Sequence, residues 1–132
     1  MTHYAGLQTP PIFMPSVGDF YAGMLVHLPL HADQFNAAVD ADQLYQLYAD
    51  WYAGAALVRM GAACANDENT PNMLAADALA DTDSMEILVF SDAQARRFWL
   101  VARLDNLGKG ASGAAVQNMN IALGIDEGIS LA

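Results

Sequence analysis

The sequence is poor in cysteine and in cations, and each shortage excludes a class of protein. Cys64 is the only cysteine among 132 residues, which excludes an internal disulfide framework and a cysteine-rich zinc site. Five Lys and Arg stand against 15 Asp and Glu, giving a net charge of −10. We therefore expect no binding to nucleic acid or to an anionic membrane surface. The use of cysteine fits a reducing cytoplasm.

Long apolar runs and targeting signals are also missing. No stretch approaches the ~20 apolar residues that a membrane span requires. The opening "MTHYAGLQTPP" has neither a basic nor an apolar signal region, so we expect a soluble, unexported protein. With 55% hydrophobic residues, a chain of this length can bury one core and is too short for two full domains. We predict a single domain over residues 1–132.

The strand signals predict an α+β domain. "PPIFMPSVGDFYAGMLVHLPL" predicts two strand segments interrupted around 16–23, with Pro29 placing the second at a sheet edge or a bulge. "MEILVF" and "RFWLVARL", separated by "SDAQAR", predict an antiparallel hairpin. The apolar run "AALVRMGAA" precedes a polar excursion with one expected helical turn at 74–79. The resulting order, β-β-α-β-β-β-α, is typical of a mostly antiparallel sheet with helices packed on it.

Two helices complete the predicted elements. In "VDADQLYQLYADWYAG", Asp40 and Gln43 are placed to form a capping box ahead of the helix. A second helix is predicted over about 111–123. The first helix carries one apolar stripe at helical spacing, made of Leu44, Leu47, Tyr48, Trp51 and Tyr52.

The stretch "GKGASG", residues 108–113, matches G-x-G-x-x-G letter for letter. A dinucleotide fingerprint also needs a crossover helix and a second parallel strand, whereas "GIDEGISLA" after the helix provides no strand. We therefore predict a tight strand-to-helix turn, in which glycines permit positive φ or close backbone approach. Free N–H groups at the helix start leave one alternative open, a site for an anionic or amide-bearing ligand.

Other candidate sites have simpler interpretations. His27 and His31 lie in a predicted strand, where four residues span ~13 Å, too far to share one metal ion. Cys64 has no basic neighbour in "GAACAND", so we interpret it as a buried or incidental thiol. The sequence shows no nucleophile with a base, and hence no complete active site. We interpret a further group as a solvated acidic loop, namely Asp77, Asp81, Asp83 and Glu86.

Two segments carry a resemblance to a known family. "DNLGKGASGAAVQNMNIALG" resembles the C-terminal signature of N-acetyl-gamma-glutamyl-phosphate reductases, enzymes of arginine biosynthesis. "PIFMPSVGDFYAGMLVHLPLH" is similar to the F-x-P-x-x-G-x-F-x-x-G-M-x-V-x-V-P-L segment of that family, especially of its type 2 branch. The resemblance covers essentially the whole chain. It implies a C-terminal substrate-binding and dimerisation domain, like that of glyceraldehyde-3-phosphate dehydrogenase-like enzymes.

The resemblance also implies an activity and partners. This family uses NADPH to reduce the acyl phosphate N-acetylglutamyl 5-phosphate to its semialdehyde: a cysteine thiolate forms a thioester, hydride reduces it, and phosphate leaves. The cysteine, the histidine acid/base and the NADP-binding Rossmann domain are expected upstream of this chain, which would be inactive alone. We also expect a homo-oligomer formed through the sheet, and packing of 105–124 on the Rossmann domain.

Individual residues take their expected roles from the same resemblance. Asn106 matches an asparagine expected near the nicotinamide carboxamide, and its side chain has the donor and acceptor for that amide. Gly108, Lys109 and Gly110 would shape the adjoining cofactor loop. Ser16 matches a position at the rim of the substrate pocket, and a turn residue following proline is an equal alternative.

Two departures from the family pattern concern the substrate. Tyr21 and Ala22 stand where the family commonly has Arg or another polar residue. "TDSM", with Asp83 at its second position, stands where the family has "TN" followed by a basic residue. Both changes bring binding of an acyl phosphate into question. They motivate the alternative of a stand-alone, non-enzymatic oligomerisation or ligand-binding module derived from this domain.

Overall fold

The computed structural model describes residues 4, 6–61, 73–92, 94 and 96–132 and has an α+β fold. One four-stranded sheet has the strand order β1-β4-β3-β2. β4 pairs antiparallel with both β1 and β3, and β2 pairs parallel with β3. The predicted mostly antiparallel α+β class is confirmed. The strands are β1 (Met24–His31), β2 (Val58–Met60), β3 (Met85–Ser91) and β4 (Arg97–Leu104).

The predicted hairpin of β3 and β4 forms the centre of the sheet. Both strands bury apolar side chains on each of their faces, Val89 and Leu100 on one and Leu88 and Val101 on the other. Val101 of β4 has no exposed surface at all. On the other face of β4, Phe98 and Leu100 pack with Val89 of β3 and Leu44 of the helix above, forming the main core cluster.

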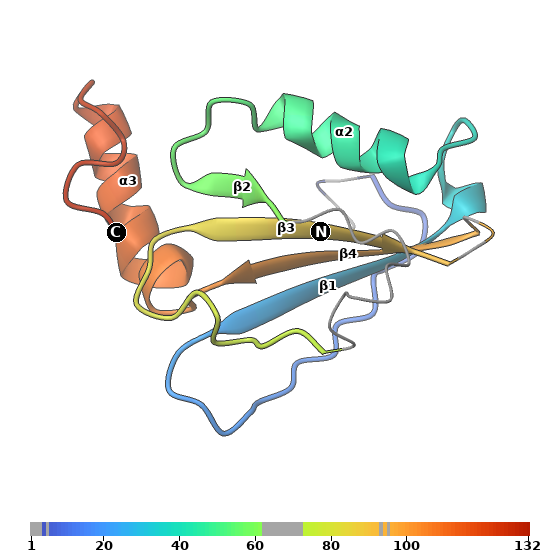
Figure 1. The fold of residues 1–132 in the computed structure, drawn as a ribbon, viewed down its shortest axis with the longest axis horizontal. Helices are drawn as coiled ribbons and strands as arrows, with labels where there is room; N and C mark the ends of the chain where they lie inside the picture. The colour runs from blue at the N-terminus through green and yellow to red at the C-terminus, as the bar shows by residue number, and fades with distance from the viewer. Residues whose placement is uncertain (1–3, 5, 62–72, 93, 95) are drawn as a thin grey trace.

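α2 (Ala41–Trp51) covers one face of the sheet, and α3 (Gly113–Ala122) stands at one end of it (Figure 1). The capping box before α2 is confirmed, because the Gln43 N–H donates to Asp40 Oδ1 at 2.8 Å and the Asp40 N–H donates to Gln43 Oε1 at 3.0 Å. The predicted stripe is only partly right. Leu44 is buried, but Leu47 and Trp51 are 62% and 79% exposed, because α2 packs on β3 and on the three-residue β2.

None of the helices in the described residues has both the length and the apolar character needed to cross a bilayer.

Only one of the two strand segments expected before residue 32 forms. Residues 10–23 contain no strand, so the prediction of the first segment is wrong. Pro10, Pro11 and Pro15 lack the N–H donors that a strand ladder uses. β1 itself lies at the sheet edge, so the position inferred from Pro29 is confirmed. The apolar side chains of the failed strand are exposed, namely Ile12, Phe13, Met14 and Val17.

The segment that leads into β3 lies against the sheet face opposite α2. Leu74 packs against the cluster of Leu88 and Val101 on that face, and Arg103 Nη1 donates to the Ala75 carbonyl at 3.4 Å. The helical turn expected at 74–79 is instead a series of hydrogen-bonded turns. Cys64 and the rest of 62–72 lie outside the described residues. η1 (Ala32–Gln34) is a short 3-10 helix after β1.

Candidate functional site

Three segments of the chain meet at the junction where β4 ends. The loop 105–113 leaves β4 and runs between the segments that lead into β1 and into β3. Asn106 Oδ1 accepts the Gly23 N–H at 2.8 Å, which ties the loop to the start of β1. Asp105 Oδ2 accepts the Asp81 N–H at 2.7 Å, which ties it to the approach to β3. In Figure 1 this junction lies at the end of the sheet beside α3.

Asp105 is the residue whose hydrogen bonds hold this junction together. It is 2% exposed, and its Oδ1 accepts the N–H groups of Leu107 at 2.6 Å and Gly108 at 3.1 Å. These two bonds, with that from Asp81, hold the pKa of Asp105 below its ordinary value against the opposing effect of burial. Sequence reasoning missed Asp105. An aspartate directly after a strand and before a glycine turn is typical of residues that bond N–H groups two or three positions on.

"GKGASG" begins with a turn of π-helix, η2 (Gly108–Ser112). The Gly110 N–H donates to the Asp105 carbonyl at 2.8 Å and the Ser112 N–H to the Leu107 carbonyl at 3.0 Å, both five residues back. Such π-helical turns are rare in proteins, and those that occur are often found at functional sites. These two N–H groups and that of Gly108 are therefore bonded within the chain and are not free for a ligand.

The dinucleotide fingerprint fails on topology, as predicted. β4 is antiparallel to both of its neighbours, and no strand follows α3 in the described residues. The glycines instead permit close approach. A Cβ at Gly108 would lie 2.5 Å from the Thr82 carbonyl oxygen, and one at Gly113 would overlap the Asp83 carboxylate. Gly23 has φ +135°, and a Cβ there would lie 2.5 Å from the Ala76 carbonyl oxygen.

The structure brings four of the five predicted site residues into one loop. Asn106 is half-buried and fixed through Oδ1, while its Nδ2 donates no hydrogen bond within the described part of the chain. Gly108 and Gly110 follow it in the π-turn. Lys109 Nζ turns along α3 and donates to Gln117 Oε1 at 2.5 Å. Ser16 lies in the exposed stretch 10–21, and no hydrogen bond among the described residues joins it to the loop.

The predicted solvated acidic loop is wrong for two of its four members. Glu86 is a β3 residue whose side chain is 12% exposed and forms ion pairs with Arg103 and, at 3.6 Å, with Arg59. Asp83 accepts the Ala132 N–H at 3.0 Å. Strand pairing and contacts with residues distant in sequence therefore hold these two carboxylates, which do not belong to a solvated loop.

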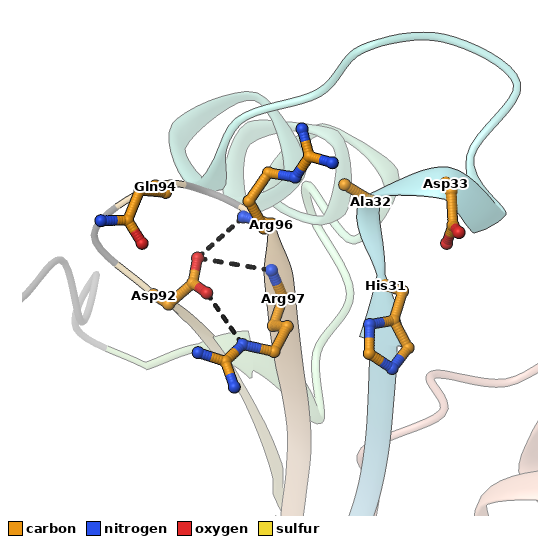
Figure 2. A pocket seen from close by; sticks show the side chains of 7 residues that line it. All are labelled: His31, Ala32, Asp33, Asp92, Gln94, Arg96 and Arg97. Carbon is orange, nitrogen blue, oxygen red and sulfur yellow. Dashed lines mark hydrogen bonds and ion pairs between the residues drawn. The ribbon is translucent and has the colours of Figure 1, made fainter.

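A pocket of about 320 Å³ lies at the other end of the sheet (Figure 2). One of its two carboxylates, Asp92, accepts the Arg96 N–H at 2.7 Å and accepts from Arg97 Nε at 2.9 Å. The Arg97 side chain is the main cause of the lowered pKa of Asp92, followed by the Arg96 N–H. The eight residues of β1 separate this end from the Asn106 loop by roughly 23 Å, seven steps of about 3.3 Å each. The lining residues are His31, Ala32, Asp33, Asp92, Gln94, Arg96 and Arg97.

The two strand histidines lie in β1 as expected. The His27 ring contacts that of Trp99, with centroids 5.2 Å apart, and His31 lines the pocket. No group of three or more His, Cys, Asp or Glu side chains in the described residues is arranged to hold a metal ion.

Comparisons with known proteins give a consistent family. Residues 1–106 match the family described as "Semialdehyde dehydrogenase, dimerisation domain". N-acetyl-gamma-glutamyl-phosphate reductase of Trichormus variabilis is 41% identical over 134 residues, which cover 99% of this chain and 41% of the relative. The N-acetyl-gamma-glutamyl-phosphate reductase of Sinorhizobium medicae is 40% identical over 119 residues, covering 89% and 37%. The chain thus spans about two fifths of the length of the curated relatives it matches.

Proposed function

Because the chain belongs to the semialdehyde dehydrogenase dimerisation domain family, we propose that it is the C-terminal substrate and dimerisation domain of an N-acetyl-gamma-glutamyl-phosphate reductase. The whole enzyme would use NADPH to reduce N-acetylglutamyl 5-phosphate to the semialdehyde. Relatives with that name match up to 99% of this chain. The observation that carries the proposal is Asn106, whose amide is fixed on one side and still has donors to offer on the other.

Asn106 suits recognition of a carboxamide. A nicotinamide carboxamide presents one carbonyl acceptor and one amide donor, and an asparagine amide is complementary to such a pair. The Gly23 N–H holds Oδ1 at 2.8 Å, so Nδ2 would donate to the carboxamide oxygen from a set orientation. NADPH, once bound, would supply the hydride. Gly108 and Gly110 keep the loop free of side chains beside it, and Lys109 is drawn away toward Gln117.

The remaining chemistry falls to an N-terminal Rossmann domain that would bind most of the cofactor and provide the cysteine and the histidine. α3 and the residues after it offer that domain an apolar surface. Met119, Ile121 and Leu123 are 53%, 55% and 66% exposed, more than a packed helix leaves to solvent. We infer that 105–124 packs on the Rossmann domain, and that the chain alone does not turn over substrate.

The sheet face opposite α2 is the surface we assign to a second copy. Trp99 is 47% exposed there, and its ring contacts those of His27 and Phe90. The cations of this face are paired, since Glu86 bonds Arg103 and Asp92 bonds an arginine at its far end. An aromatic surface with its charges neutralised suits association between copies.

Sedimentation tests this surface with two matched tryptophans. Trp99→Asp should raise the dimer dissociation constant at least tenfold, because a carboxylate would be buried in the interface. Trp51→Asp is the control, since Trp51 is 79% exposed on α2, away from that face. Equal association of both variants and the unmodified chain at tens of micromolar would exclude this surface.

A chimera tests the reductase proposal. This chain would replace the matching C-terminal part of the Trichormus variabilis reductase, to which it is 41% identical, and the acyl-phosphate reduction rate would be measured. Asn106→Ala should raise KM for NADPH about tenfold or more, as expected for loss of a directed hydrogen bond. Ser16→Ala should raise KM for the acyl phosphate and leave that for NADPH unchanged. A folded, NADPH-binding chimera with no reductase activity would contradict the proposal.

A non-enzymatic oligomerisation or ligand-binding module is the second candidate. The observation that favours it is Tyr21, which is 89% exposed where the resembled family commonly has a polar or cationic residue. Introducing a cation with Tyr21→Arg in the chimera distinguishes the module from the reductase. A large gain in acyl-phosphate affinity from an inactive starting point would favour the module, whereas activity already present with Tyr21 would favour the reductase.

A further inference from the structure

Asp83 joins two parts of the molecule that are 49 residues apart. Its N–H donates to the Ala132 carbonyl at 2.5 Å, and its Oδ2 accepts the Ala132 N–H at 3.0 Å. Two hydrogen bonds between the same pair of residues fix both position and orientation. The segment 126–132 is therefore held against the approach to β3.

The other carboxylate oxygen of Asp83 lies against the glycine loop. A Cβ added at Gly113 would overlap Oδ1, and one added at Gly108 would lie 3.2 Å from it. The backbone of the π-turn therefore lies close to this carboxylate at its first residue, Gly108, and at Gly113, which directly follows its last residue. A shift of Asp83 would therefore remove a close contact at both ends of the turn.

Segment 126–132 is also tied to α3 and, through α3, to the loop itself. Asn120, which is 2% exposed, donates from Nδ2 to the carbonyls of Ile129 at 2.9 Å and Glu127 at 3.2 Å. The Glu127 carboxylate accepts from Gln117 Nε2 at 2.7 Å, and Gln117 accepts from Lys109. These contacts form a closed ring from the loop, through α3 and the C-terminal segment, to Asp83 and back to the loop.

We propose that Asp83, clamped by segment 126–132, is a positioning residue that sets the glycine loop and with it the donor group of Asn106. The inference rests on the proposed function for the ligand of Asn106, and on the contacts above for the positioning. It changes the meaning of the departure at Asp83. The carboxylate is directed to main-chain groups of its own chain, which gives this residue a structural role.

The test uses the ¹⁵N-labelled chain without ligand, followed by NMR. Asp83→Ala removes both carboxylate contacts, and amide exchange at Gly108 and Ser112 should rise about tenfold with a shift of the Asn106 side-chain amide signals. Asp83→Asn keeps the size and one acceptor, so it should restore the signals of the unmodified chain. Asp42→Asn, an exposed carboxylate on α2, is the control for charge alone.

Glu127→Gln provides a second variant that leaves Asp83 in place. It weakens the ring at its far side, and the same signals should move in the same direction by a smaller amount. Unchanged Asn106 and Gly108 signals in folded Asp83→Ala protein would overturn the proposal, as would equal shifts in Asp83→Asn and Asp83→Ala.

A nicotinamide mononucleotide titration keeps this inference separate from the proposed function. The unmodified chain should show saturable shifts at Asn106, and Asp83→Ala should weaken binding at least fivefold while Asp83→Asn does not. If the unmodified chain shows no shift at Asn106, the cofactor site fails, while the ligand-free spectra still decide the positioning role. If binding weakens in Asp83→Ala with an unaltered ligand-free loop, positioning is refuted.

Discussion

At each end of the sheet one aspartate accepts hydrogen bonds from backbone N–H groups, but the two aspartates have very different structural roles. At the β4–α3 end, Asp105 is 2% exposed, and one of its three donors lies 24 residues away. At the hairpin end, the partners of Asp92 among the described residues lie four and five positions on, and its side chain is 20% exposed. The pKa of each carboxyl is lowered by its hydrogen bonds. The two aspartates differ in burial and in how far along the chain their donors lie. These two properties, rather than the number of hydrogen bonds, make Asp105 and not Asp92 the residue that organises a site.

The largest expected effect is that of Asp105→Ala. It would leave three N–H groups without their acceptor in a buried place, at a cost of ~1–3 kcal/mol each. We expect the free energy of unfolding to fall by about 3 kcal/mol or more, measured by urea denaturation. A loss no larger than that of Asp92→Ala would show that the two ends are equivalent.

The next effect is steric and concerns Gly113→Ala. The new Cβ would overlap the Asp83 carboxylate, and overpacking of this kind costs ~1–3 kcal/mol. The same substitution in an Asp83→Ala background should cost much less, because the overlapping group is gone. Additive costs in this double-mutant cycle would mean that the close contact does not constrain the loop.

The pH dependence distinguishes charge from shape at Asp105. Its folded pKa lies below the unfolded value near 3.9, so its stabilisation is fully present above that value and is lost as pH falls through the folded pKa. The stability difference between the unmodified chain and Asp105→Asn should therefore be constant from pH 7 to about 5 and shrink below about pH 4. A difference independent of pH down to 3 would assign the effect to shape alone.

The smallest effect is expected for Asp92→Ala. The described partners of this carboxylate are local, and the Arg97 side chain that pairs with it is 71% exposed, so ion pairing there is screened. We expect Tm to change by no more than about 2 °C, while amide exchange at Arg96 and Arg97 becomes faster. A large fall in Tm would give the hairpin end a role in global stability that its contacts do not indicate.

Short-range signals made most of the fold predictable from sequence. The β3–β4 hairpin and the capping box of α2 each depend on residues close together in the chain. The expected strand before residue 16 failed because it has no partner in the sheet, and strand formation depends on pairing more than on composition. The exposure of Leu47 and Trp51 also depends on the sheet. The sheet beneath α2 is narrow, and its width cannot be inferred from the sequence of the helix.

The site was predictable in part and for a different reason. Asn106, Gly108, Lys109 and Gly110 were identified by resemblance, and their roles remain predictions. Asp105 had a local signal that went unused. The link of Asp83 to Ala132 had none, because no periodicity or motif connects residues 49 positions apart.

The π-turn has a consequence for how this domain tolerates changes in length. Its five-residue hydrogen bonds accommodate a residue that an α-helix would not hold. Deleting one residue from 109–111 would let the turn close as an ordinary α-helix, so the later side chains of α3 would keep their directions. The same deletion within α3 would turn every later side chain by about 100° and move Asn120 away from the carbonyls of segment 126–132. The π-turn is therefore the place where this part of the domain tolerates a change of one residue in length.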